Sequence, residues 1–199
     1  TGAPGKSGVF QVSTITVPAS AFLVTVNLVD KFWNVATERI GTSQDTNPPV
    51  AAGEVPNVIV AAPLDPSAVI SPAGATALSL GTKGFNVTPF TSLSSYSVVA
   101  TTAAAPVVTY SSGTSTPYTV YPGPTEHLHF TNLLSTTVNA GALFQFGFIA
   151  HDPYHNLVST GPNKYNGTVN IQTPPIVPAN GNQLPSISPT DIVFSSGAV

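Results

Sequence analysis

Cysteine and methionine are both absent from this 199-residue sequence. The lack of cysteine excludes a disulfide framework and a thiolate metal site. The lack of methionine indicates that residue 1 is not a translation start, so we expect a chain that was processed or taken from a longer one, with any signal peptide already removed.

Charge is scarce as well. Charged residues make up 7% of the chain, against about 25% in an ordinary soluble domain. Only 5 residues are Lys or Arg, too few for the cationic surface that nucleic acid requires. A formal net charge of -3 gives copies little electrostatic repulsion. We therefore expect large permanent contacts with other chains, or a glycan coat, and no nucleic-acid partner.

Long apolar runs and known catalytic motifs are also missing. No segment approaches the roughly 20 apolar residues of a membrane-spanning helix, so no membrane span is expected. The sequence has no G-x-S-x-G, P-loop or H-E-x-x-H motif. Its 8 acidic residues form no evident carboxylate pair. The chain is not expected to be an enzyme.

What the sequence does contain predicts an all-β fold. The 20 Pro and 16 Gly interrupt every window that could hold three helical turns. Short runs rich in Val, Thr, Ile, Phe and Tyr lie between these breaks, as is typical of strands. The clearest run, AFLVTVNLVD, places Phe22, Val24 and Val26 on one face. We expect these three to be buried.

A second run, LFQFGFIAHD, repeats the first at a spacing of 122 residues, which relates Asp152 to Asp30. The same spacing relates Phe144 to Phe22, so Phe144, Phe146 and Phe148 are expected to be buried as well. The Asp at the end of each run begins the motif Asp-x-aromatic-x-Asn. The repeat predicts two β-sandwich modules in tandem.

The proposed boundaries follow from the strand-like runs. The first module spans 8–102, with about seven strands. An extended connector over 103–124 could itself pair as a strand. The second module spans 125–199 and is expected to be incomplete. We expect its last run, 191–199, to pair with a strand from another molecule or from a continuation of the chain.

The second module also resembles a known family. The stretch VNAGALFQFGFIAHDPYHNLVSTGPNKYNGTVNI is similar to the tandem immunoglobulin-like repeats of large bacterial and archaeal surface proteins. The resemblance implies immunoglobulin-like modules in a structural or adhesive protein. Where that family usually has Gly before the Asn, this chain has Trp33 and His155. These bulky residues predict a different turn, or side chains held against a neighbour at a module or subunit boundary.

The Asp and Asn of each motif, Asp30 with Asn34 and Asp152 with Asn156, are predicted to close a tight turn by accepting backbone N–H bonds. Calcium binding is the alternative, since that ion takes carboxylate and carbonyl oxygens. Each motif offers one carboxylate, whereas calcium sites usually combine several. No other cofactor is expected.

Other candidate sites involve His, aromatic and Asn residues. His127 and His129 share one strand face and could hold zinc or copper if a third ligand approached. Exposed aromatic side chains near the turns could stack on carbohydrate, although repeated aromatics are more often buried. The candidates for interface or sugar contacts are Trp33, Tyr154 and His155, and the glycosylation sequons begin at Asn86 and Asn166.

The leading hypothesis is a non-catalytic subunit or module of an extracellular fibre, sheath or surface layer. It would associate by β-strand pairing with copies of itself or with neighbouring modules. The alternatives are a ligand- or carbohydrate-binding module of a large surface adhesin and an accessory domain of a secreted hydrolase.

Overall fold

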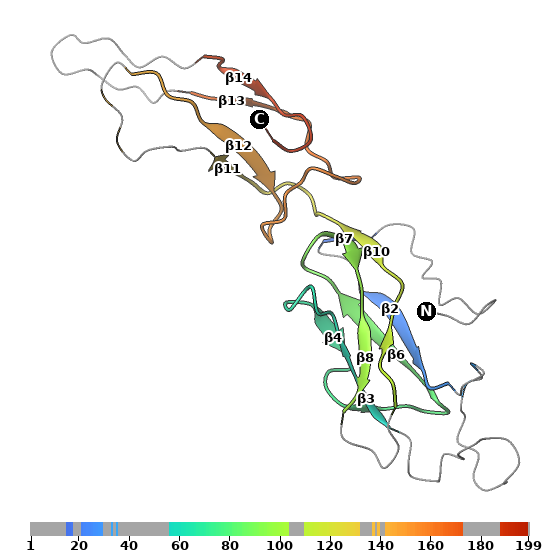
Figure 1. Cartoon of the computed structure of the whole chain (residues 1–199). Coiled ribbons are helices and arrows are strands. Elements are labelled where there is room, and N and C mark those ends of the chain that lie inside the picture. The colour runs from blue at the N-terminus through green and yellow to red at the C-terminus, as the bar shows by residue number, and fades with distance from the viewer. Residues whose placement is uncertain are drawn as a thin grey trace, which may run out of the picture. The chain divides into compact units, whose positions relative to one another are not determined.

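The structure is a computed structural model, and it describes residues 15–17, 21–29, 33, 35, 56–103, 110–131, 137, 139, 142–172 and 188–198. The chain divides into two compact units, unit 1 (Thr1–Tyr121) and unit 2 (Pro122–Val199). Every regular element in the described ranges is a β-strand (Figure 1), so the all-β prediction is confirmed.

The strands of unit 1 are short, and most are directly preceded or followed by a Pro, Gly or Ser. Those in the described ranges are β1 (Ile15–Thr16), β2 (Phe22–Asn27), β3 (Asn57–Ala61), β4 (Val69–Ser71), β5 (Thr76–Ala77), β6 (Thr82–Thr88), β7 (Leu93–Tyr96), β8 (Val99–Thr102), β9 (Gly113–Thr114) and β10 (Tyr118–Tyr121).

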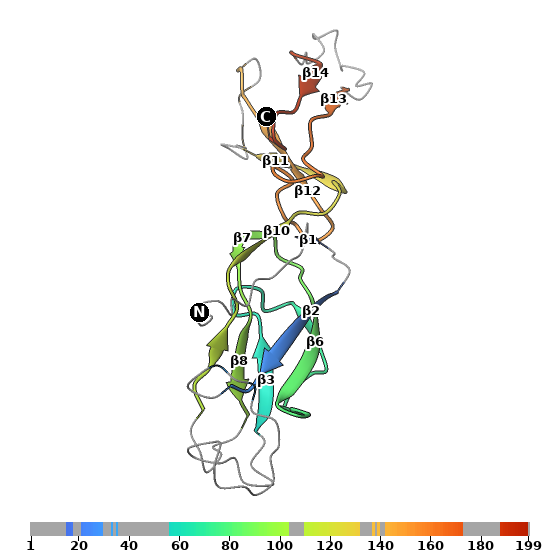
Figure 2. The ribbon, with the colours of Figure 1, turned by 90° about the vertical axis from the view of Figure 1, so that its right-hand side faces the viewer.

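These strands form a β-sandwich. One sheet has the order β2-β6-β4, and a second has the order β5-β3-β8-β9. A third group has the order β1-β10-β7. It continues the second sheet, because Val98 lies between β7 and β8, Ser115 lies between β9 and β10, and the backbone N–H of Ser115 donates to the Val98 carbonyl at 2.9 Å. All pairings are antiparallel except that of β1 with β10, which is parallel. Figure 2 shows β2 and β6 side by side.

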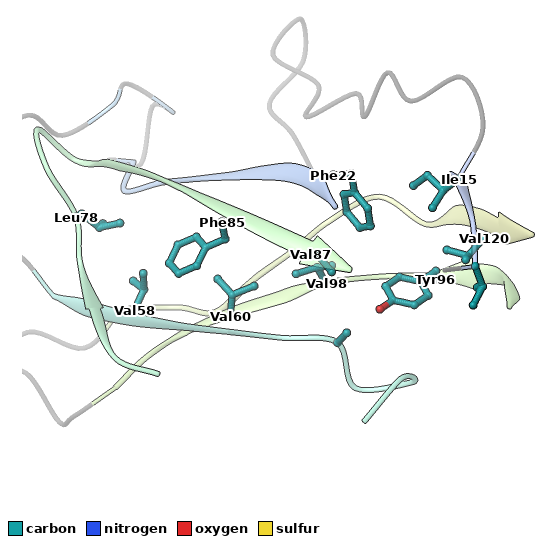
Figure 3. Packing of buried hydrophobic residues seen from close by; sticks show 12 residues of the cluster. Ile15, Phe22, Val58, Val60, Leu78, Phe85, Val87, Tyr96, Val98 and Val120 are labelled. Atoms are coloured by element: carbon teal, nitrogen blue, oxygen red, sulfur yellow. The ribbon is translucent and has the colours of Figure 1, made fainter. Parts of the chain in front are cut away.

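The core of unit 1 lies between the two layers. In Figure 3, Phe85 points from β6 toward Val58 and Val60 of β3. The buried cluster comprises Ile15, Val17, Phe22, Val58, Val60, Ala62, Leu78, Phe85, Val87, Tyr96, Val98 and Val120. Residues from distant parts of the sequence therefore meet in a single core.

The alternation predicted for β2 is confirmed. Phe22 is 7% exposed and belongs to the buried cluster, whereas Val24 and Val26 are only half-buried and pack against that cluster, so the expected burial holds fully for Phe22 alone. Leu23, on the opposite face, is 62% exposed. One face of β2 is thus in the core and the other faces solvent, as a period of two requires.

Two strands lie inside the range 103–124 that the sequence predicts as a connector. Strand β9 pairs with β8, and β10 pairs with both β1 and β7. The division into units falls after Tyr121. The expectation that this range could itself pair as a strand is therefore met by β9 and β10, and its described residues up to Tyr121 belong to unit 1.

Unit 2 contains two short antiparallel pairs in its described ranges. Strand β11 (His127–Thr131) pairs with β12 (Gly147–His151), and β13 (Thr168–Asn170) pairs with β14 (Asp191–Val193). The backbone N–H of Ala150 donates to the Gly197 carbonyl at 2.8 Å, and that of Phe194 donates to Gly167 at 2.9 Å. These bonds connect the segment after β14 to β12 and β13.

The core of unit 2 is small, and the prediction for Phe144 is wrong. Phe148 is buried at 5% exposure with Ala150, Val158 and Phe194, as predicted, whereas Phe146 is only half-buried and packs against this cluster. Phe144 is 56% exposed. The β11–β12 ladder ends at the pair Thr131 and Gly147. Phe144 therefore lies beyond the end of the ladder, where the small core no longer covers it.

The described part of the run 191–199 is paired within the chain. Strand β14 hydrogen-bonds with β13, and Ala198 forms an isolated bridge with Ile149. The described part of this run therefore has intrachain partners. Pairing of β14 with another chain along its second edge stays a prediction.

Candidate functional site

The turn that follows β12 is organised by the carboxylate of Asp152, which is fully buried. Its Oδ1 accepts hydrogen bonds from the backbone N–H of Tyr154 and of Asn156, both at 2.9 Å. Its Oδ2 accepts one from the backbone N–H of Gly123, also at 2.9 Å. The Asn156 side-chain Nδ2 donates to both oxygens, at 3.1 and 2.9 Å. The carboxylate thus closes the turn and binds the first residues of unit 2.

Two features of this turn recur in unit 1 at the 122-residue spacing. Val29 forms an antiparallel bridge with Val35, and His151 forms one with Leu157. Trp33 has a φ of 66°, and His155 has a φ of 63°. Because both residues take the positive φ that Gly would supply, the bulky residues have not produced a different turn. The motif residues Asp30 and Asn34 lie outside the described residues.

The contacts of Asp152 favour the structural interpretation of the motif over calcium binding. The hydrogen bonds described above for this carboxylate, all with described residues, have N–H groups as donors. An N–H group points its partially positive hydrogen at the carboxylate, where it would repel a cation. A calcium site instead surrounds the ion with oxygen atoms. Both oxygens of Asp152 are therefore already occupied by donors that close the turn.

A second buried carboxylate, Asp65, was not recognised from the sequence. It is 2% exposed and accepts bonds from the backbone N–H groups of Phe90 and Thr91, at 2.8 and 3.1 Å. The hydroxyls of Thr91 and Tyr96 donate to it at 2.9 and 3.1 Å. Burial, followed by the charge of Asp65, raises the pKa of the Tyr96 hydroxyl. The available signal was an Asp in a Pro-flanked turn, PLDPS, between two strands.

The structure brings all 4 histidines of the chain together in unit 2. His127 lies directly opposite His151 in the β11–β12 ladder, and His129 is two residues further along β11. His155 is in the turn organised by Asp152. The ring centroids of His129 and His151 are 4.6 Å apart, and those of His127 and His155 are 4.9 Å apart. We refer to these four residues as the histidine cluster.

The polar contacts of the cluster are few. The His127 Nε2 lies 3.3 Å from the Nδ1 of His155, and the His127 Nδ1 lies 3.2 Å from an oxygen of Glu126. The Nδ1 of His151 is buried and has no hydrogen-bond partner among the described residues. Burial, followed by the neighbouring imidazoles of His129, His127 and His155, lowers the pKa of His151. These causes favour the neutral form of His151, which offers a lone pair.

The sequence predicted a metal pair at His127 and His129 that lacked a third ligand. The structure places His151 where a third ligand would have to lie, since one nitrogen from each of the three residues lies within 4.8 Å of the other two. The missing information was the register of β11 against β12, which brings together residues about 20 positions apart. His151 and His155 were visible only as residues flanking the repeated motif.

The remaining candidates lie at the surface. Trp33 and Tyr154 are each 41% exposed, and His155 is also exposed. The sequon residues Asn86 and Asn166 are both exposed, and the Asn166 Oδ1 accepts a hydrogen bond from the backbone N–H of Ser196 at 3.2 Å. Both sequon residues are thus at the surface, and glycosylation at either stays a prediction.

Comparisons with known proteins found no match for this chain among protein-family models, curated proteins or solved structures. Among the described residues, no helix is long and apolar enough to cross a membrane.

Proposed function

We propose that this chain is a non-catalytic structural module of an extracellular fibre, sheath or surface layer, built from two immunoglobulin-like sandwiches in tandem. Two features support the tandem arrangement. The strand orders β2-β6-β4 and β3-β8-β9 in unit 1 correspond to the B-E-D and C-F-G orders of immunoglobulin sheets. The turn at Trp33 recurs at His155 with the same bridge and the same positive φ.

The observation on which the assembly proposal rests is an exposed aromatic surface on unit 2. Phe130 and Phe144 are 59% and 56% exposed, and the ring of Phe146 lies 5.8 Å from each of theirs. Leu143, beside Phe144 in the chain, is 95% exposed. We call these four residues the aromatic patch. The three rings lie close to one another and Leu143 adjoins them in the chain. Exposed apolar groups gathered in this way mark interaction surfaces.

A second copy of this chain is the partner that best fits the patch. With charged residues at 7% of the sequence, copies have little charge to keep them apart. Phe130 lies on β11, which pairs with β12 alone among the described residues. Pairing along the other edge of β11 would therefore bring the aromatic patches of two copies alongside each other.

The test is the association state of the full chain, measured by sedimentation velocity over a wide concentration range, with electron microscopy of the same samples. We expect oligomers or filaments. Leu143→Ser combined with Phe144→Ser should raise the concentration needed for association at least tenfold, because burying each large apolar side chain contributes about 1.5–3 kcal/mol.

Val69→Ser is the matched control, because Val69 is 56% exposed on β4 of unit 1 and lies outside the patch. Circular dichroism should show that all variants are folded. A chain that stays monomeric at every concentration, or a control that weakens association as much as the double variant, contradicts the proposal. All samples should contain a chelator, so that metal binding does not affect the result.

A second candidate function is carbohydrate binding by a surface adhesin module, and the partial exposure of Trp33 and Tyr154 favours it. An exposed aromatic face can stack on a sugar ring. Binding of the monomeric chain to a glycan array, lost in Trp33→Ala or Tyr154→Ala, would support this function.

A further inference from the structure

We propose that the histidine cluster of unit 2 is a binding site for one divalent transition-metal ion of the zinc or copper type, with His127, His129 and His151 as ligands and His155 as the fourth. This inference does not depend on the assembly proposed above, and either can fail without the other.

The first argument is convergence. The chain has 4 histidines in 199 residues, and all of them belong to the cluster. At the matching positions of unit 1, 122 residues earlier, His151 is replaced by Val29 and His155 by Trp33. The repeated turn therefore does not require histidine at either position. Its presence at both positions in unit 2 calls for another explanation, and metal binding provides one.

The second argument is geometric. A tetrahedral ion bound at about 2.0–2.1 Å by imidazole nitrogens holds neighbouring nitrogens about 3.3 Å apart. The His127 Nε2 and His155 Nδ1 are separated by 3.3 Å. The three nitrogens of His127, His129 and His151 lie within 4.8 Å of one another. Binding would then require side-chain rotations that bring these nitrogens closer together around one ion.

The third argument concerns rigidity. His127 and His151 are direct partners in a five-pair antiparallel ladder, so their backbone separation is determined by the sheet. His155 is held by the turn in which its backbone N–H donates to the Asp152 carbonyl at 3.0 Å. A preformed set of ligands loses little conformational entropy on binding, which favours affinity.

The fourth argument is the chemistry of the donors. Neutral imidazole suits zinc, copper and nickel, whereas calcium and magnesium prefer oxygen. His151 has a buried Nδ1 without a hydrogen-bond partner among the described residues. A buried nitrogen of this kind is costly unless it is paired, and a coordinated ion satisfies the lone pair of an imidazole nitrogen. Glu126 contacts the His127 Nδ1 at 3.2 Å and can orient that ring, as carboxylates commonly do for histidine ligands.

The experiment is isothermal titration calorimetry of the chelator-treated full chain with ZnCl₂ and separately with CuSO₄, using CaCl₂ and MgCl₂ as hard-ion controls. We expect one transition-metal ion per chain, a Kd in the micromolar range or below, and no comparable binding of calcium or magnesium. Electron paramagnetic resonance of the copper-loaded chain should show hyperfine coupling to imidazole nitrogens.

The variants are His129→Ala and His151→Asn, and Thr131→Ala is the control. Thr131 lies two residues from His129 on the same face of β11 but offers no imidazole. We expect each histidine variant to weaken zinc binding at least tenfold and the control to bind like the parent chain. His129 is exposed, so His129→Ala should fold even if His151→Asn does not.

A second readout is thermal. A saturating ion at about 100 times its Kd should raise the melting temperature of unit 2 by on the order of 10 °C in scanning calorimetry of the full chain. Unchanged affinity in His129→Ala, or transition-metal binding that occurs only at millimolar concentration, would overturn the proposal.

Discussion

Replacing Asp152 by Ala tests whether the turn after β12 depends on a buried carboxylate. The substitution removes the acceptor of bonds from three backbone N–H groups, those of Gly123, Tyr154 and Asn156. The Gly123 bond is buried, and the other two are partly buried. A hydrogen bond to a charged group contributes about 1.5–3 kcal/mol, and an unpaired buried donor costs about 1–3 kcal/mol.

The expected loss is about 3–5 kcal/mol, less than a simple sum because water can reach the donors of exposed Tyr154 and partly exposed Asn156. That is a large share of the stability of a small domain, which is about 5–15 kcal/mol in total. Urea unfolding followed by circular dichroism measures it. The control is Asp191→Ala, since Asp191 is exposed and its side chain accepts one bond from Asn170. A loss below about 1 kcal/mol for Asp152→Ala would refute the reasoning.

Three further predictions concern other buried groups and turns. Above pH 10 the hydroxyl of a tyrosine ionises in the unfolded chain but stays neutral in the folded chain if its pKa is raised there. The free energy of unfolding should then fall by about 1.4 kcal/mol per pH unit for each such tyrosine. Tyr96→Phe should remove this dependence for Tyr96, whose pKa is raised by burial and then by Asp65; equal slopes in alkaline unfolding curves would contradict this. Ser196→Asn should stabilise unit 2 by up to about 1 kcal/mol, because Ser196 and Gly197 both have positive φ, as in an Asn-Gly hairpin turn; a lowered melting temperature would count against it. Gly197→Ala should cost more than about 2 kcal/mol, since its Cβ would overlap the Val158 carbonyl, and an unchanged urea midpoint would rule this out.

The strand content could be predicted from the sequence because it depends on local pattern. The alternation of Phe22, Leu23 and Val24 gives the same buried and exposed faces in the structure. The Asp-x-aromatic-x-Asn motif likewise predicted a closed turn, and Asp152 closes one through the predicted N–H bonds. In both cases the determining contacts are within a few residues of each other in the chain.

The features that could not be predicted depend on long-range register. The failure at Phe144 arises because the β11–β12 ladder stops at Gly147, and no local pattern gives the length of a ladder. The histidine cluster depends on His127 lying opposite His151. The buried Asp65 binds groups 25 to 31 residues away, so its role also required the tertiary structure.

The parallel pairing of β1 with β10 has a mechanical consequence. Ile15 pairs with Val120, and Thr16 pairs with Tyr121, so the first and last described strands of unit 1 are neighbours. When such a unit is pulled from opposite ends, the two strands are drawn past each other along their length. Their hydrogen bonds then bear the load together instead of opening one at a time. Unit 1 is thereby connected in a shear geometry, which resists extension better than a hairpin peeled from one end.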